Sequence, residues 1–224
     1  MRASLLSRLQ QQVLEAFFRR ERNFFLTGGA ALAGYHLQHR HTEDLDLFTI
    51  EENLDDADRA LAAVAEELGG TLEQTKTTQD FRRRIVRHGD EAVVVDLVHD
   101  RAPQGEVPKV QFGAVRVDPP EEILANKLCT LLSRSELRDL VDVYALEEAG
   151  FRVEDALPLA QRKDGGLTPL QLDWVLSQID LARLPDGKIV LAESRPSDDA
   201  PTRNELQQFL RGLSRRLLLL SPHP

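Results

Sequence analysis

The chain has 224 residues, of which 42% are hydrophobic and 29% are charged, and this composition is typical of a globular protein with its own hydrophobic core. Its formal net charge of −9 and its sequence pI near 5.2 argue against a general nucleic-acid coat protein, whose surface would be basic. The single cysteine, Cys129, excludes an intrachain disulfide framework, and no apolar run reaches the length of a membrane span. We therefore expect a protein without membrane segments in a reducing, cytoplasmic setting.

The first part of the chain alternates helices and strands. Apolar positions spaced by three or four predict an amphipathic helix within residues 3–22. A short apolar run then leads through the motif TGG at 27–29 into an Ala/Leu-rich segment, which indicates the order strand, glycine turn, helix. The stretch HTEDLDLFTI at 41–50 alternates polar and apolar side chains and predicts a strand. Residues 54–70 predict a helix that ends at a glycine pair.

Three further strands are expected, with the sequences TLEQTKT, FRRRIVRH and AVVVDLVH. A hairpin turn at Gly89-Asp90 would join the last two, and a pair of short strands is expected around residues 109–117. Within FRRRIVRH, strand alternation places Arg82 and Arg84 on one face and Arg83 on the other. Two interpretations stay open: one face of this strand lines a groove for a phosphate or an acceptor, or the charges protect a solvated edge strand.

The pattern becomes helical after residue 118, where the sequence reads DPP, and stays so almost to the last residue. We expect a polar, proline-rich loop at 185–201 and a closing helix with a capping box formed by Thr202 and Glu205. Two domains are therefore predicted, a core of residues 1–118 and a helical domain of residues 119–224. Cys129 and Trp174 are expected in the helical core.

Asp44 and Asp46 raise a question of electrostatics, because a strand with period two points both carboxylates out of one face. Two like charges so close repel unless a cation lies between them, and Mg²⁺ prefers one or two carboxylates together with phosphate oxygens. Asp96 is a third candidate, since it stands within an otherwise apolar run. If its strand lies beside the first, three carboxylates converge and can hold two ions. The alternatives are that Asp96 pairs with an arginine, or that Asp100 is the third ligand.

Gly28 and Gly29 lie between a predicted strand and a predicted helix. Glycine there lets the backbone approach a ligand closely, and the free N–H groups at the start of the helix favour an anion. Thr27 could cap the helix or give its hydroxyl to a phosphate oxygen. The alternative is a plain strand-to-helix turn, which the order of the glycines before the aspartate strand disfavours.

Gly28-Gly29, then Asp44-Leu45-Asp46, then Asp96 on a later strand resemble the nucleotidyltransferase superfamily that includes DNA polymerase beta. The context FLTGGAALAGYHL…HRHTEDLDLF is similar more narrowly to the AbiEii/AbiGii group, the toxin nucleotidyltransferases of bacterial abortive-infection and toxin–antitoxin systems. The later EEILANKLCTLLSRSELRDLVDVYAL resembles a helical segment of that group. The residues that match its pattern are Lys127, Arg138, Asp139 and Asp142. The resemblance covers residues 23–148 and implies an α+β fold, with a polymerase-beta-like mixed sheet and helices followed by a helical C-terminal unit.

The resemblance also implies roles for single residues. It places Mg²⁺, with Mn²⁺ as an alternative ion, at Asp44 and Asp46, and it places Asp96 near the attacking hydroxyl. It gives Lys127 a role against the triphosphate and Asp139 a further role in the site. From the residues alone, Lys127 could also be a surface lysine, and Arg138-Asp139 could be an ordinary salt-bridge pair on a helix.

The function predicted from these observations is the transfer of a nucleoside monophosphate from an NTP to a hydroxyl group. The acceptor would be an RNA, with a tRNA 3′ end as one candidate, or a protein side chain. The toxin resemblance implies an antitoxin protein as partner. The alternatives are a non-catalytic nucleotide-binding or interaction module of the same fold, and a phosphotransferase of another family that uses the same Asp-x-Asp motif.

Overall fold

The computed structural model describes residues 4–183, 189 and 200–221 of the chain. It divides into two compact units. The first comprises Met1–Arg101 with Pro108–Pro119, and the second comprises Ala102–Val107 with Pro120–Pro224. The segment 102–107 thus leaves the first unit and joins the helices of the second. That these units correspond to the two domains 1–118 and 119–224 stays a prediction.

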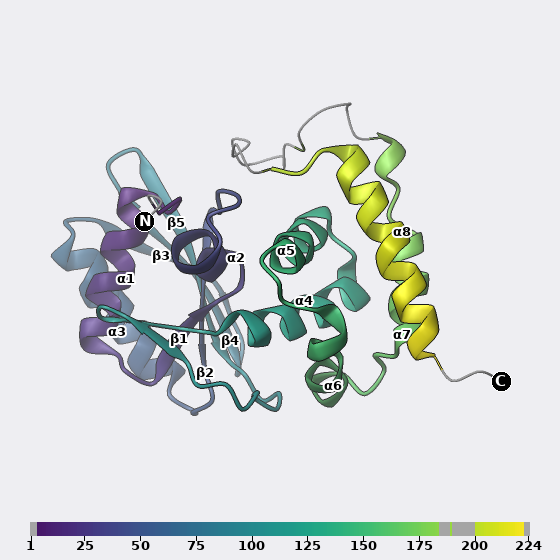
Figure 1. The fold of residues 1–224 in the computed structure, drawn as a ribbon. Helices are drawn as coiled ribbons and strands as arrows, with labels where there is room; N and C mark the ends of the chain where they lie inside the picture. Colours follow the sequence, from purple (N-terminus) through teal and green to yellow (C-terminus); the bar gives the residue numbers. More distant parts are fainter. Residues whose placement is uncertain (1–3, 184–188, 190–199, 222–224) are drawn as a thin grey trace. The chain divides into compact units, whose positions relative to one another are not determined.

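The first unit is built on a mixed sheet, which has seven strands among the described residues (Figure 1). Its order is β3-β4-β5-β2-β1-β7-β6. The pairs β2–β5 and β1–β7 are parallel, and the other neighbours are antiparallel. In chain order the strands are β1 (Phe24–Thr27), β2 (Asp44–Thr49), β3 (Thr71–Thr77), β4 (Phe81–His88), β5 (Glu91–His99), β6 (Val110–Phe112) and β7 (Val115–Val117). The sheet and its helices confirm the predicted α+β class.

Helices α1 (Arg8–Arg20) and α3 (Leu54–Glu67) pack against each other and against the sheet. β1 runs directly into α2 (Gly28–Ala31), which continues as a π-helical turn, η1 (Leu32–His36). In β2, Leu45, Leu47 and Thr49 are buried, whereas Asp44, Asp46 and Phe48 are half-buried. The predicted alternation is therefore present, and both aspartates lie on one face of the strand.

The second unit is helical. Its elements are α4 (Pro120–Arg134), α5 (Leu137–Glu148), α6 (Val153–Lys163), α7 (Pro169–Ser177), a 3₁₀ turn η2 (Leu181–Arg183) and α8 (Arg203–Leu220). α4 packs against α5, α6 and α7, and α7 packs against α8 (Figure 1). The predicted capping box is present at the start of α8, where Thr202 and Glu205 bond each other's backbone N–H groups. The loop expected at 185–201 lies almost wholly outside the described residues.

Glu122 of a buried ion pair holds the segment 102–107 in the second unit. Nζ of Lys163 lies 2.6 Å from Oε1 of Glu122, and the backbone N–H of Gly105 donates to Oε2 of Glu122 over 2.7 Å.

The expectation that Trp174 belongs to the helical core is wrong, because 64% of this residue is exposed on α7. A helix as short as α7 buries only one stripe, and Trp174 lies outside it. In the described ranges, no helix is long and apolar enough to cross a membrane.

Candidate active site

The sheet places the predicted carboxylates side by side. β2 and β5 are parallel neighbours, and their register sets Asp46 opposite Asp96. On the other side of β2, Thr27 of β1 lies opposite Asp46. Directly opposite residues of adjacent strands share a face of the sheet. Thr27, Asp46 and Asp96 therefore form one row across three strands, whereas Asp100 follows the end of β5 and bonds the carbonyl of Thr49 through its backbone N–H.

Arg83 extends this row onto β4, where it lies opposite Asp96. Its guanidinium binds the buried carboxylate of Asp96 through two hydrogen bonds, Nε to Oδ1 at 2.8 Å and Nη2 to Oδ2 at 2.7 Å. These bonds raise the pKa of Arg83, and although partial burial opposes the rise, the charges of Asp96, Asp44 and Asp46 add to it. Arg83 thus lies within the field of all three carboxylates.

The three aspartates are not gathered as a ready metal cluster. Within the described part of the chain, no group of three or more His, Cys, Asp and Glu side chains has an arrangement that could hold an ion. The structure thus contains the Asp96–arginine pair that the sequence left open as an alternative. Sequence reasoning missed Arg83 as a site residue, although the alternation of β4 already separates it from Arg82 and Arg84.

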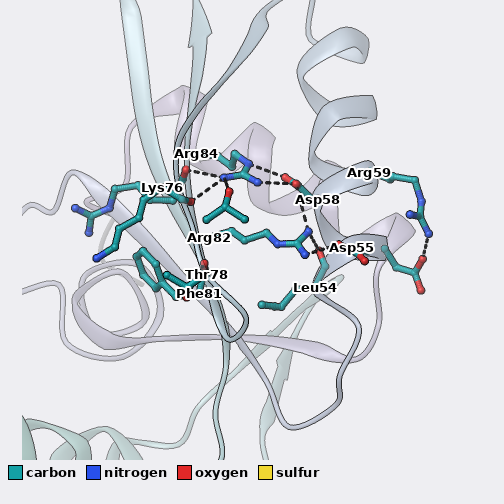
Figure 2. Close-up of polar contacts among 12 residues, drawn as sticks. Leu54, Asp55, Asp58, Arg59, Lys76, Thr78, Phe81, Arg82 and Arg84 are labelled. Carbon is teal, nitrogen blue, oxygen red and sulfur yellow. Dashed lines mark hydrogen bonds and ion pairs between the residues drawn. The ribbon is translucent and has the colours of Figure 1, made fainter.

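Arg82 and Arg84 point the other way, toward α3, as Figure 2 shows. Arg84 is 1% exposed and binds Asp58 through Nε to Oδ1 at 2.7 Å and Nη2 to Oδ2 at 2.6 Å. Arg82 donates to the carbonyl of Leu54 at 3.0 Å and pairs with Asp55 and Asp58. The edge-strand interpretation is wrong, because β4 lies between β3 and β5. The groove interpretation is excluded for the face of Arg82 and Arg84, which contacts α3, and stays a prediction for the face of Arg83.

The turn between β1 and α2 requires glycine for two reasons. Gly28 has a φ of +63°, a conformation that side chains rarely adopt. A Cβ built on Gly28 would also overlap Oδ2 of Asp46. The backbone of this turn consequently lies directly against the second aspartate. That the turn binds phosphate stays a prediction.

Thr27 and Arg40 complete the surroundings of the turn. The hydroxyl of Thr27 makes no capping bond to α2, and it is buried without a hydrogen-bond partner among the described residues. A Cβ on Gly29 would meet the guanidinium of Arg40, a buried side chain that also donates to the carbonyl of His41 at 3.0 Å. Arg40 was not predicted from the sequence, since nothing in its local pattern distinguishes it from a loop arginine. It brings a positive charge to the glycine turn.

A hydroxyl also fixes the first aspartate. Thr42 donates to Oδ1 of Asp44 at 3.0 Å. This hydrogen bond, from a residue just before β2, orients one oxygen of Asp44. The carboxylate lies on the same face of β2 as that of Asp46.

A second cluster of predicted residues lies between α4 and α5 of the helical unit. Nζ of Lys127 is 2.7 Å from Oδ1 of Asp139 and 2.6 Å from Oδ2 of Asp142, and all three side chains are buried. Arg134 also binds Asp139, with Nε 2.9 Å from Oδ2. Burial acts to raise the pKa of Asp139, but Lys127 and Arg134 outweigh it and the pKa is lowered. Arg138 pairs with Glu136 over 2.6 Å rather than with its neighbour Asp139.

The donor set beside the glycine turn fits a divalent ion that carries phosphate. Asp44 and Asp46 supply hard carboxylate oxygens from one strand face, which Mg²⁺ and Mn²⁺ both accept. The unpartnered hydroxyl of Thr27 and the close backbone at Gly28 lie on the Asp46 side of that face. Such a set can bind a nucleoside triphosphate and stabilise charge that develops on its phosphates.

Solved structures of other proteins have the same fold as this chain. A protein from H. pylori assigned as a nucleotidyltransferase aligns with a TM-score of 0.57 and 24% identity, over 96% of both chains. JHP933 from Helicobacter pylori aligns with a TM-score of 0.54 and 24% identity, over 94% of this chain and 91% of that one. The nucleotidyltransferase toxin MenT4 from Mycobacterium tuberculosis H37Rv aligns with a TM-score of 0.50 and 16% identity, over 96% and 82%.

No curated protein matches the sequence. The profile of one family, described as the nucleotidyl transferase AbiEii toxin of type IV toxin–antitoxin systems, matches residues 12–219. This match spans both units and confirms the resemblance drawn from the glycines and aspartates. The chain belongs to the AbiEii family of nucleotidyltransferase toxins.

Proposed function

We propose that the protein transfers a nucleoside monophosphate from an NTP to a hydroxyl group with the help of Mg²⁺, or of Mn²⁺ in its place. The observation that carries this proposal is the row formed by Thr27, Asp46 and Asp96, with the Gly28 turn against Asp46. On this proposal, a site for phosphate and a site for a divalent ion would share one face of the sheet.

Asp44 and Asp46 would hold the ion, which when bound supplies positive charge to the phosphates and to the leaving pyrophosphate. The hydroxyl of Thr27 and the backbone at Gly28 and Gly29 orient the triphosphate. Asp96 lies beside Asp46, where it would complete the metal site as its third carboxylate and accept the proton of the attacking hydroxyl. The proposed ion, the triphosphate and the attacking hydroxyl would therefore all lie on the face of the sheet that carries Asp44 and Asp46.

Lys127 is proposed to contact the triphosphate, and Asp139 to act by holding the lysine in place. Both roles rest on the resemblance of the α4–α5 segment to a helical segment of the toxin nucleotidyltransferases. In this structure the ammonium of Lys127 is buried and paired with Asp139 and Asp142.

The proposed acceptor is an RNA, with a tRNA 3′ end as the first candidate, or a protein hydroxyl. An antitoxin protein is the proposed partner, since the family belongs to toxin–antitoxin systems. The cytoplasm, where NTPs and tRNA are present, is the proposed location.

Transfer can be tested with purified protein, Mg²⁺, total tRNA and each α-labelled NTP in turn. We expect label in RNA or in a protein band with at least one NTP, and its loss in Asp46→Asn. Label that appears equally with Asp46→Asn would contradict the assignment of this residue. Metal-dependent NTP binding without any labelled product would favour the non-catalytic nucleotide-binding module instead.

A further inference from the structure

Arg83 occupies both oxygens of the carboxylate that the proposed reaction needs. The fork of its guanidinium binds Asp96 over 2.7 and 2.8 Å. A carboxylate held in this way keeps only its outer lone pairs for another ligand. A divalent ion placed beside Asp46 would also meet the positive charge of Arg83, because Asp46 and Arg83 flank Asp96 on either side in the same row.

The contacts of Arg83 allow it to leave this position. Its side chain is 47% exposed, and its guanidinium carbon also lies 5.8 Å from the centroid of the Phe81 ring. Lys76, which lies opposite Arg83 on β3, is 5.4 Å from the same centroid. Figure 2 shows Lys76 and Phe81 on the side of the strands away from Asp58. The guanidinium already lies near this ring while it binds Asp96, so it can keep the cation–π contact and stay in solvent when its bonds to the carboxylate break.

Arg84, on the same strand, has more contacts than Arg83 and is fixed in the fold. It is almost wholly buried, and besides Asp58 it donates to the carbonyls of Lys76 and Arg83 at 3.0 Å and to the hydroxyl of Thr77 at 3.1 Å. These bonds would all be broken if it moved. Among the residues that the structure describes, the guanidinium of Arg83 donates its hydrogen bonds to Asp96 alone.

We propose that Arg83 is an internal counter-ion that competes with the divalent ion for Asp96 and so sets the affinity of the site for metal. When the ion binds, the guanidinium turns from Asp96 toward the Phe81 side and the carboxylate becomes available to the site. This inference rests on the proposed assignment of Asp44, Asp46 and Asp96 to a metal site. It assigns to Arg83 a positioning role, because it acts through Asp96.

The test is Mn²⁺ binding to the full-length protein, measured from the electron paramagnetic resonance signal of free Mn²⁺. Arg83→Gln should bind Mn²⁺ about tenfold more tightly than the wild type, which corresponds to about 1.4 kcal/mol. Arg83→Lys, which keeps the charge but cannot bind both oxygens at once, should lie between the two. Arg87→Gln is the matched control, because Arg87 lies on the same face of β4 and its loss changes the net charge equally, yet it pairs with Glu73.

A double-mutant cycle shows whether the gain passes through Asp96. In an Asp96→Asn background, Arg83→Gln should no longer tighten Mn²⁺ binding. Equal affinities of Arg83→Gln and Arg87→Gln would overturn the proposal, and so would a gain that survives in the Asp96→Asn background. If Asp44→Asn binds Mn²⁺ as the wild type does, the ion is not held at this site, and the metal assignment of the proposed function fails together with the role of Arg83.

Discussion

At the scale of single residues, Gly28 and Asp46 constrain each other. The positive φ of Gly28 excludes most side chains, and the carboxylate of Asp46 fills the space that a Cβ would need. Neither residue can therefore be enlarged without moving the other. The glycine turn and the aspartate strand, which the sequence shows as separate motifs, act as one unit in the folded protein.

Gly28→Ala should abolish most of the transfer activity, because the methyl group displaces Asp46 and strains the turn. We expect a loss of stability of about 1–3 kcal/mol from the strained backbone. Gly113→Ala is the control, since Gly113 has a φ of +59° but no atom within 4 Å of a built Cβ. It should lose stability by strain alone and keep its activity. Urea denaturation and label transfer measure the two effects, and equal activity of both variants would contradict the proposed contact.

The sequence predicts those parts of the site that depend on local patterns, and it does not predict contacts between distant residues. Alternation in HTEDLDLFTI was enough to place Asp44 and Asp46 on one face, because a period of two is a local property. The partner of Asp96 is not local, since Arg83 meets it only through the pairing of β4 with β5. Trp174 was assigned to the core on composition, and its exposure depends on which stripe of α7 the other helices cover.

At the scale of elements, β4 and α3 are joined by an ion pair between the buried Arg84 and the half-buried Asp58. Arg84 and Asp58 meet over two hydrogen bonds beneath the helix. Arg82 adds a second link to the first turn of α3 through Leu54 and Asp55 (Figure 2). Three consecutive arginines thus serve two purposes, because the outer pair fastens the helix to the sheet and the middle one faces the carboxylates.

Removal of one partner of the Arg84–Asp58 pair should be strongly destabilising. Arg84→Ala leaves Asp58 with only its contact to Arg82, and we expect a loss of about 3–5 kcal/mol. Asp58→Ala should cost a similar amount, and the double variant should cost less than the sum of the two. Urea denaturation of the four proteins gives the coupling energy. Simple additivity would show that the two side chains do not interact in solution.

The α4–α5 cluster should make stability depend on pH. The pKa of Asp139 is lowered in the folded protein, so its contribution is present above the pKa of the unfolded state, about 3.9, and is lost as pH falls through the lower folded value. Asp139→Asn should unfold more easily at pH 7 and lose less stability between pH 5 and pH 3. Asp155→Asn, at an exposed position of α6, is the control. Urea denaturation at several pH values measures these slopes, and the same slope in Asp139→Asn and the wild type would refute the prediction.

At the scale of the whole molecule, periodicity predicted most helices and strands, and the family resemblance supplied the fold class. Strands 71–77 and 81–88 were predicted with the bounds that the structure has, since turn residues flank clear β-forming runs. The segment 102–107 was not expected to leave the first unit, because its attachment to Glu122 is a contact between distant residues. Local periodicity predicts elements, whereas their assignment to units depends on such contacts.

Membership in a toxin family gives a prediction for the intact protein in a cell. Expression in a bacterial host should arrest growth, and Asp46→Asn at the same protein level should not. Growth curves after induction, with immunoblots to match expression, make the comparison. Equal growth with both proteins would remove the toxin proposal and would leave the transferase proposal to the assay with labelled NTPs.

The parallel pairing of β2 with β5 has a consequence for synthesis of the protein. β1 and β2 are close in sequence and pair as antiparallel neighbours, so the glycine turn can meet Asp46 early. Asp96 joins them only after β5 has left the ribosome and closed a long loop, which makes this pairing a slow step of folding. A nascent chain that ends before β5 therefore lacks the residue proposed to accept the proton. On the proposed role of Asp96, activity would therefore begin only after β5 has paired with β2.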